Sequence, residues 1–377
     1  MEILSQKLNF YHSFNLPGDS LTISLAISTS ISHLPITGDS FSSLKMPQTL
    51  LHLKNDQLRA LADNQRPSRA YLAPGRAVIN DIFESIRQSD EISLDRARKA
   101  GSIGKGTALG DEFCPDFDLV CFINGHMPPF SPALIQAFLR AVKKADRTTQ
   151  WQIQSITYNQ HSVQVEVVTG EGVTFKLDIL PAANLVQGDH LLNAMERLSI
   201  QEKCVGKTMR DRCKRFRERQ NFSTSLAEAT VSFVRAVPLN VSRIIRIAQY
   251  WDKCVDLGGA RLTGRSYLIE LVAMGTNLGR KPNRGLQARF SHFLHQMRTL
   301  SSACIVFTEN YEESQIPADV RRQRPLILDP INPFNNLGFQ LRKPEMAGVL
   351  QRWREAAEET LDFIGSKNDD VEAWFIF

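Results

Sequence analysis

Apolar positions along the chain follow two different periods, and the change of period divides the chain into two parts. Helical spacing marks three segments in the first half, residues 47–64, 76–88 and 132–145. Pro67 and Pro74 are expected to separate the first two of these helices. Alternating or short apolar runs predict strands at residues 117–123, 151–159, 162–169 and 173–180. From about residue 190 the helical period continues almost to the end of the chain, at residues 232–238, 241–256, 264–277 and 285–307.

This pattern predicts an α+β fold of two lobes, a mixed-sheet lobe followed by an α-helical lobe. We expect an α/β lobe at residues 46–190 and a helical lobe at residues 191–377. The apolar stretch at residues 20–35 is interrupted by Ser and Thr, and no basic cluster directly precedes it. We therefore interpret residues 1–45 as a poorly ordered N-terminal extension rather than a secretion signal.

Composition narrows the class of protein only slightly. The net charge of +5 permits an anionic partner without requiring one. Six cysteines are scattered without a Cys-x-x-Cys pair, which favours free thiols in a reducing compartment. No apolar run reaches the ~20 residues of a membrane span, so no membrane partner is expected. The expected location is the cytoplasm, with the nucleus as the alternative.

Three aspartates and a glycine turn carry the candidate chemistry. Asp116 and Asp118 are two residues apart at the start of a strand, so they share one face. Asp178 interrupts another apolar strand, where a charge is costly unless it is paired or binds a metal. Together these carboxylates could hold two Mg²⁺ ions, with Mn²⁺ as an alternative, for phosphoryl or nucleotidyl transfer. The residues alone leave other interpretations open: surface aspartates at strand ends, or a buried salt bridge at Asp178.

The run "GSIGKGT" at residues 101–107 is not a P-loop, because Lys105 is followed by Gly106 and the spacing does not fit. Gly101 and Ser102 instead offer backbone N–H groups and a hydroxyl to a triphosphate.

Several collinear motifs resemble the 2′-5′-oligoadenylate synthetase family of the polymerase β-like nucleotidyltransferase superfamily. The similar segments run from about residue 50 to residue 377 and are "GSIGKGT", "DFDLVCF", "GEGVTFKLDILPA", "NFSTSLAEATVSFV", "IIRIAQYWDKC", "RPLILDPINPFNNLG" and the final "EAWFIF". The resemblance implies a divergent member of that family with the bilobal nucleotidyltransferase fold.

The resemblance also assigns roles to single residues. It places the metal ions on the triad Asp116, Asp118 and Asp178, which would be the catalytic residues. It places the donor ATP against Gly101, Ser102, Arg246 and Tyr267. Position 249 is Gln where the family usually has a phosphate-contacting Lys, and Lys253 one helical turn later is a candidate substitute. It places an activating double-stranded RNA on a face that includes Arg87, Lys99 and Arg235.

Other positions depart from the family pattern. Ser266 replaces a Gln, Asn240 and Val231 replace basic residues of the RNA face, and the loop from Ser102 to Asp116 is longer. The Cys-Phe-Lys tract linked to oligomer formation is absent from "DFIGSKNDD", so a monomer is expected.

A basic segment between the two lobes has two interpretations. Lys207, Arg210 and Lys214 recur at helical spacing opposite an apolar stripe. They could contact RNA phosphates, or they could form an ordinary solvated helix face.

The resemblance therefore implies an enzyme that joins ATP into 2′-5′-linked oligoadenylates, releases pyrophosphate and senses double-stranded RNA in innate immunity. One alternative is a receptor of the cyclic GMP–AMP synthase type that makes a cyclic dinucleotide. The other is a catalytically silent RNA-binding sensor.

Overall fold

The computed structural model describes residues 55–146, 150–185, 222–279, 285–309 and 311–366, which belong to a compact unit spanning residues 43–377. The expected extension, residues 1–45, lies outside the described residues. So does the expected boundary at residue 190. The domain limits therefore stay a prediction, whereas the architecture can be described directly.

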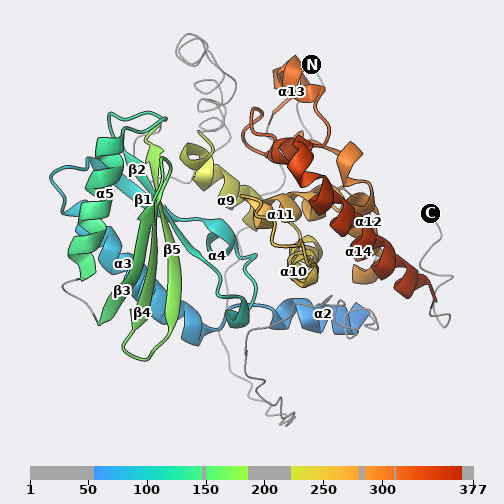
Figure 1. The fold of residues 1–377 in the computed structure, drawn as a ribbon, viewed down its shortest axis with the longest axis horizontal. Coiled ribbons are helices and arrows are strands. Elements are labelled where there is room, and N and C mark those ends of the chain that lie inside the picture. The colour runs from blue at the N-terminus through green and yellow to red at the C-terminus, as the bar shows by residue number, and fades with distance from the viewer. Residues whose placement is uncertain (1–54, 147–149, 186–221, 280–284, 310, 367–377) are drawn as a thin grey trace, which may run out of the picture. The chain divides into compact units, whose positions relative to one another are not determined.

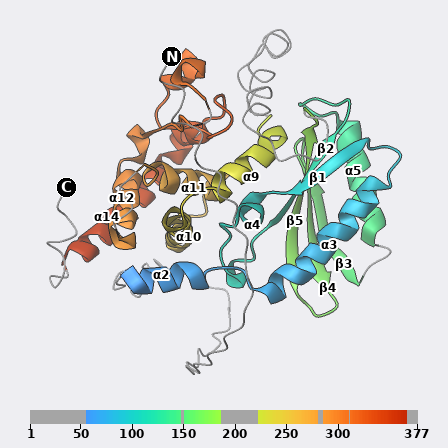
Figure 2. The same cartoon turned by 180° about the vertical axis from the view of Figure 1, so that it is seen from behind.

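The first lobe is built on a five-stranded mixed sheet with the order β1-β2-β5-β4-β3. Its central strands β2 and β5 are parallel, and all other neighbours are antiparallel. The strands are β1 (Leu94–Lys99), β2 (Phe117–Ile123), β3 (Trp151–Tyr158), β4 (Val163–Thr169) and β5 (Thr174–Ala183). Helices α3 (Arg69–Arg87) and α5 (Pro132–Ala145) cover one face of the sheet (Figure 2).

Apolar side chains on that face form the core of the first lobe. Phe117 and Phe175 from the two central strands meet Tyr71 of α3, with ring centroids 5.0–5.9 Å apart. Alternate residues of β5, such as Lys176 and Asp178, consequently face the other side of the sheet. The strand alternation read from the sequence therefore sets which side holds the core and which side holds the chemistry.

Two local expectations were wrong. Pro74 does not separate two helices, because α3 starts after the Ser68 N-cap and runs through Pro74 to Arg87. Pro74 lies in the second turn, and the carbonyl it leaves without a partner belongs to exposed Ala70, where water can bind it. Strand β1 was not expected at all, since its sequence "LDRARK" is polar. Its Arg96 is buried, and an ion pair with Glu228 at 2.7 Å neutralises its charge.

The second lobe is helical, and its helices are α2 (Asn55–Asn64), α9 (Ala227–Arg235), α10 (Leu239–Cys254), α11 (Arg265–Gly275), α12 (Leu286–Arg298), α13 (Ala318–Arg321) and α14 (Ala347–Ser366) (Figure 1). Buried Trp251, Phe293 and Trp353 lie in its core. Although α2 precedes the sheet in the sequence, its Leu58 packs into this helical core. The expected helix at 285–307 ends early, at Arg298, and is followed by the short parallel strands β6 (Cys304–Ile305) and β7 (Leu326–Ile327).

The architecture is thus the predicted α+β bilobal fold. Within the described residues, no helix combines the length and apolar character needed to cross a membrane.

Candidate active site

The three predicted catalytic aspartates meet on the sheet face that α3 and α5 leave uncovered. Asp118 of β2 and Asp178 of β5 are direct partners in the parallel pair, so their backbones are about 4.8 Å apart. Asp116 immediately precedes β2 and lies two residues from Asp118 on the same face. Strand pairing therefore brings Asp118 and Asp178 together, although they are 60 residues apart in the sequence.

These carboxyl groups destabilise one another's charged forms. Burial and the neighbouring Asp178 and Asp116 raise the pKa of Asp118 to about 7. Burial and Asp178 also raise the pKa of Asp116, and burial raises that of Asp178. A site of this kind binds a proton or a cation more readily than an isolated aspartate does.

The glycine turn touches this cluster directly. Residues Gly101–Lys105 form a short helix, α4, rather than an open turn. Gly101 has φ +57°, and a Cβ placed on it would lie 1.6 Å from the Asp118 Oδ2 atom. The preceding Ala100 donates its N–H to the Asp118 carbonyl at 2.9 Å. Only glycine allows the backbone to approach the carboxylate this closely, and Ser102 follows at the start of the same helix.

The helical lobe holds the segment from α4 to the short 3₁₀-helix η1 (Asp111–Phe113) through several contacts. Lys105 Nζ forms an ion pair with Glu270 of α11 at 2.7 Å, and Thr107 donates to the same carboxylate at 2.8 Å. Phe113 packs edge-on against Tyr250 of α10, with ring centroids 5.8 Å apart. Two further contacts come from arginines that the sequence had assigned to ligands.

Those two arginines donate to backbone carbonyls of the glycine segment. Arg235, a predicted RNA contact, donates to the Gly104 carbonyl at 2.7 Å. Arg246, a predicted ATP contact, donates to the Gly106 carbonyl at 3.2 Å and to the Ala62 carbonyl at 2.7 Å. Arg246 is buried, and that burial lowers its pKa to about 10, so it stays charged at neutral pH.

The remaining predicted ATP contacts lie at different depths. Lys253 is exposed on α10 and close enough to Asp116 to favour its charged form, whereas Gln249 is buried one turn earlier. The Tyr267 ring lies under Lys105, whose Nζ is 4.0 Å from the ring centroid. Burial raises the pKa of Tyr267 well above its ordinary value. Lys253 is therefore the predicted donor contact that faces the carboxylates from the helical lobe.

The predicted RNA contacts are only partly described. Lys99 lies beside Arg76 of α3, and burial together with Arg76 lowers the pKa of Lys99. Arg87, at the end of α3, pairs with Glu84 at 2.6 Å. Lys207, Arg210 and Lys214 lie outside the described residues, so the two interpretations of their segment stay open.

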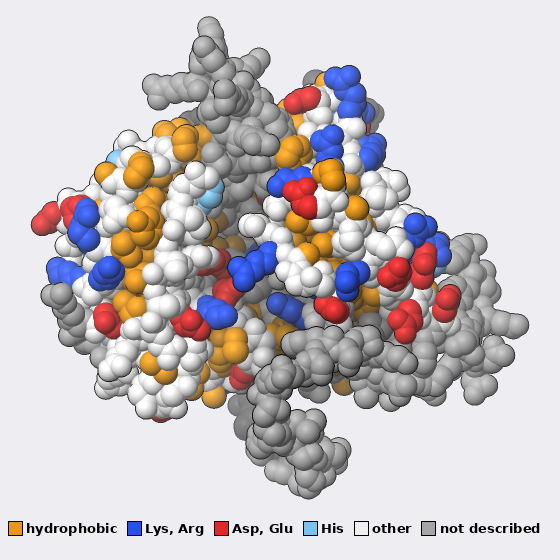
Figure 3. All heavy atoms as spheres, viewed as in Figure 1, with side chains coloured by type: hydrophobic (Ala, Val, Ile, Leu, Met, Phe, Trp, Pro, Cys, Tyr) orange, Lys and Arg blue, Asp and Glu red, His pale blue; other side chains and the backbone are white. Residues whose placement is uncertain are grey.

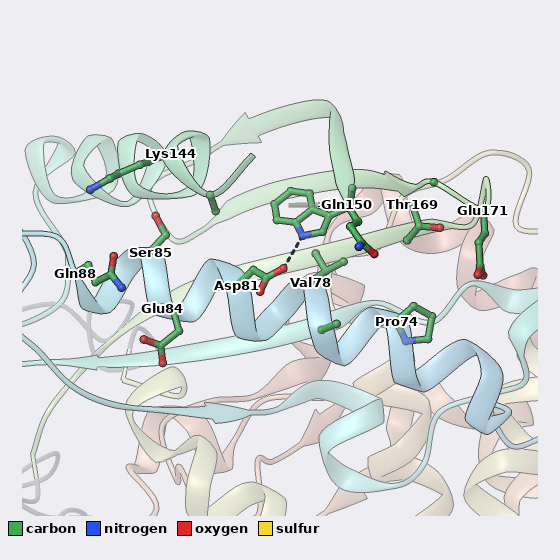
Figure 4. A pocket seen from close by; sticks show the side chains of 14 residues that line it. Pro74, Val78, Asp81, Glu84, Ser85, Gln88, Lys144, Gln150, Thr169 and Glu171 are labelled. Atoms are coloured by element: carbon green, nitrogen blue, oxygen red, sulfur yellow. Dashed lines mark hydrogen bonds between the residues drawn. The ribbon is translucent and has the colours of Figure 1, made fainter. Parts of the chain in front are cut away.

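Two cavities lie on opposite faces of the sheet. The smaller, about 230 Å³, adjoins the aspartates and is lined by Asp116, Ser155, Thr157, Gln164, Val165, Glu166, Lys176, Leu177 and Asp178. The larger, about 830 Å³, lies between α3 and α5, where Trp151 Nε1 donates to Asp81 at 2.9 Å (Figure 4). The smaller cavity is the one connected to the candidate chemistry. In the space-filling view, acidic and basic side chains lie together in the hollow between the lobes (Figure 3).

The residues present fit a hard divalent cation. All three candidate ligands are carboxylates, the ligand type that Mg²⁺ prefers, and their mutual repulsion is what a bound cation would relieve. Among the described side chains, no group of three or more His, Cys, Asp or Glu residues, this cluster included, is placed so that it could hold a metal ion as it stands. The fit therefore rests on the chemistry of the three carboxylates and on the repulsion between them.

Comparison with known proteins shows which proteins this chain is similar to. Residues 200–376 match the family model described as 2′-5′-oligoadenylate synthetase 1, domain 2, C-terminus. The rat 2′-5′-oligoadenylate synthase 3 is 23% identical over 303 residues, covering 74% of this chain and 26% of the relative. The chain is thus similar to the 2′-5′-oligoadenylate synthetase family, at low identity, and its C-terminal part matches the model of that family. It spans about a quarter of the length of the first synthases it matches.

Bacterial proteins share the fold of this chain. The cyclic AMP-AMP-AMP synthase of Escherichia coli is 25% identical over 293 residues, covering 74% of this chain and 80% of the relative. The solved complex of E. coli CdnC with HORMA superposes with a TM-score of 0.57, at 19% identity, over 83% of this chain and 91% of that one. The structure of CdnC with ATP gives a TM-score of 0.55. These likenesses establish the nucleotidyltransferase fold.

The ion pair between Lys105 and Glu270 provides a stability test. Both side chains are buried, at 8% and 1% exposure. We expect Glu270→Gln to lower the free energy of unfolding by about 3 kcal/mol, because it leaves the ammonium group buried without its partner. Replacing both, Lys105→Met with Glu270→Leu, should restore most of that loss. Chemical denaturation would measure both.

A matched control is Glu91→Gln, which removes the partner of Arg140 in an exposed pair. That change should cost less than about 1 kcal/mol. An equal loss for Glu91→Gln and Glu270→Gln would contradict a special role for the buried pair.

The raised pKa of Asp118 gives a pH prediction for the metal-free protein. The folded state keeps a proton on Asp118 up to about pH 7, whereas the unfolded chain releases it near pH 4. The contribution of Asp118 to the free energy of unfolding is therefore fully present at low pH, and it is lost as the pH rises from about 4 to 7. Asp118→Asn should raise the free energy of unfolding by about 4 kcal/mol at pH 8, where the whole shift of about three pKa units applies, and by about 2 kcal/mol at pH 5. Thermal unfolding at the two pH values, in chelator, would test this, and a gain that does not depend on pH would contradict it.

Proposed function

We propose that this chain is an ATP-using nucleotidyltransferase that forms 2′-5′-linked oligoadenylates and releases pyrophosphate. The observation that carries the proposal is the pairing of Asp118 with Asp178 beside Gly101 and Asp116. An acyl or peptide substrate would need a nucleophile and base pair, whereas three carboxylates next to a backbone N–H cradle suit phosphate chemistry. Similarity to the 2′-5′-oligoadenylate synthetases favours the 2′-5′ linkage.

The residues would divide the reaction between them. The donor triphosphate lies between α4 and α10, where Ser102 and Lys253 contact its phosphates. The acceptor 2′-hydroxyl lies at Asp178, and its oxygen forms a bond to the donor α-phosphorus as the bond to pyrophosphate breaks. The hydroxyl proton passes to the Asp178 carboxylate. Mg²⁺ or Mn²⁺ held by Asp116, Asp118 and Asp178 would stabilise phosphate charge and lower the pKa of the acceptor hydroxyl.

Activation by double-stranded RNA forms the second part of the proposal. Arg69, Arg76 and Arg87 are separated by 7 and 11 residues on α3, which places them on one side of that helix. Lys99 lies beside Arg76 at the end of β1. Such a line of cations suits the phosphates of an RNA duplex. Arg235 would link the RNA face to the active site, since it contacts the α4 backbone beside the carboxylates.

A cyclic product is the second candidate. The similarity to the E. coli cyclic AMP-AMP-AMP synthase favours it, because that relative is matched over most of its length. Both candidates use the same carboxylates, so product analysis separates them and mutation of the triad does not.

The deciding experiment incubates the full chain with ATP and Mg²⁺, with and without long double-stranded RNA. Products are digested with a nuclease specific for 3′-5′ linkages and then sized. Resistant linear oligoadenylates that appear only with RNA would support the whole proposal. The same products without RNA would remove the activator, a cyclic product would favour the second candidate, and no product under any condition would favour the silent sensor.

A further inference from the structure

The uncovered face of β3, β4 and β5 carries two rows of polar side chains that start at the catalytic aspartates. The first row follows direct strand partners from Asp118 to Asp178, then Gln164, then Thr157. The second row runs parallel to it, two residues away along each strand, and contains Lys176, Glu166 and Ser155. Asp116 lies at its β2 end, next to the pair Phe117 and Leu177.

A bulge in β3 creates the outer end of both rows. The register shifts between Ile153 and Ser155, so the side chains beyond this point change face. Ser155 and Thr157 are consequently exposed on the same side as Gln164, and Ser155 donates to Glu166 at 3.3 Å. These residues line the cavity of about 230 Å³ that adjoins the triad.

This cavity lies on the acceptor side of the triad. In the strand order β1-β2-β5-β4-β3, α4 follows β1 on one side of β2, whereas the cavity lies over β5, β4 and β3 on the other. The donor triphosphate is proposed to lie against α4 and α10, so the second substrate must approach over the rows.

Lys176 is the cation of this surface. It is exposed, lines the cavity, and lies close enough to Asp116 to favour that residue's charged form. No ion pair of Lys176 is found among the described residues, and Glu166, its partner across the strand, accepts a hydrogen bond from Ser155. It lies two residues from Asp178, about 6.6 Å along the strand, which is comparable to the length of a ribose.

We propose that Lys176 binds the 5′-phosphate of the acceptor nucleotide, so that this chain selects phosphorylated acceptors over nucleosides. The inference rests on the proposed function, because it assumes that an acceptor hydroxyl lies at Asp178. An acceptor held in this way points its hydroxyl at the triad and its phosphate at Lys176. Gln164, Thr157 and Ser155 then face its sugar and base with hydrogen-bonding groups.

The test measures acceptor preference with 2′,3′-dideoxy-ATP as the donor, because this nucleotide has no acceptor hydroxyl. Adenosine and AMP are compared as acceptors for the full chain and for Lys176→Met. A charge-assisted contact predicts that Lys176→Met lowers kcat/KM for AMP about tenfold and leaves that for adenosine within about twofold. Lys176→Arg should keep most of the preference for AMP. The control Lys143→Met removes an exposed lysine of α5, on the other face of the sheet, and should change neither value.

Other outcomes would overturn the inference. Equal losses with adenosine and AMP would place Lys176 at the donor or in the fold, and unchanged preference would remove it from recognition. Equilibrium binding of AMP to the wild-type chain and to Lys176→Met is measured in parallel. If the wild type transfers nothing, the proposed function fails, but weaker AMP binding in the variant still supports the phosphate site and equal binding rejects it.

Discussion

Asp178→Asn is expected to leave the fold intact and to lower turnover by at least about a thousandfold. Asparagine has nearly the same size, so the pairing of β5 with β2 and β4 is preserved. In the proposed mechanism, the change removes the carboxylate that would hold the metal ions and would take the proton of the acceptor hydroxyl. The loss should appear in kcat rather than in binding of the donor, which lies on the α4 side. Initial rates with ATP and Mg²⁺, together with the melting temperature, would measure both effects.

The same change has a predictable side effect on the neighbouring carboxyl groups. Asp178 raises the pKa of both Asp116 and Asp118, so removing its charge should lower both pKa values. The metal-free variant should therefore be at least as stable as the wild type at pH 8. Lost turnover with unchanged or higher stability is a combination that simple misfolding cannot produce.

Asp90→Asn is a suitable control, because Asp90 is exposed after α3 and has no ion pair among the described residues. It should be indistinguishable from the wild type. Turnover of Asp178→Asn close to that of the wild type would remove Asp178 from the reaction, and with it the argument from the paired strands.

The carboxylate cluster could be predicted from the sequence because local rules determine it. Spacing of two residues puts Asp116 and Asp118 on one face, and a charge inside an apolar strand singles out Asp178. The same rule places Lys176 on the face of Asp178, so the position of this lysine also follows from the sequence. The three carboxylates then come together because β2 and β5 are neighbours in the sheet.

The contacts around the glycine segment could not be predicted in this way. Glu270 is 165 residues from Lys105, and Arg235 is 131 residues from Gly104. Such pairs depend on how the helical lobe packs against the sheet. The spacing of apolar residues along the sequence carries no information about that packing. The resemblance gave Arg235 and Arg246 roles toward ligands, which stay predictions. The structure adds contacts of both side chains with the backbone of the glycine segment. Polar β1 was missed for a similar reason, since Arg96 is buried only because distant Glu228 neutralises it.

Gly101 was a candidate from the sequence, and the structure shows how closely it approaches Asp118. Its substitution is the second change with a large expected effect on activity. Gly101→Ala should lower kcat by about a hundredfold or more. The new methyl group would lie 1.6 Å from Asp118 Oδ2, so either the carboxylate or α4 must move. Displacement of a reacting group by about 1 Å is enough for a loss of this size. Initial rates at saturating ATP would measure it.

Gly106→Ala separates this clash from backbone strain. Gly106 also has a positive φ, +78°, but a Cβ at that position would meet no atom within 4 Å. Both variants should lose about 1–2 kcal/mol of stability, because alanine disfavours the left-handed region. Only Gly101→Ala should also lose activity and binding of Mn²⁺, since only its methyl group reaches Asp118, which we propose to hold the metal. If the two variants lose activity equally, the left-handed backbone matters and the contact with Asp118 does not. If Gly101→Ala alone is impaired, the close approach of the glycine backbone to Asp118 is what places the donor phosphates against the carboxylates.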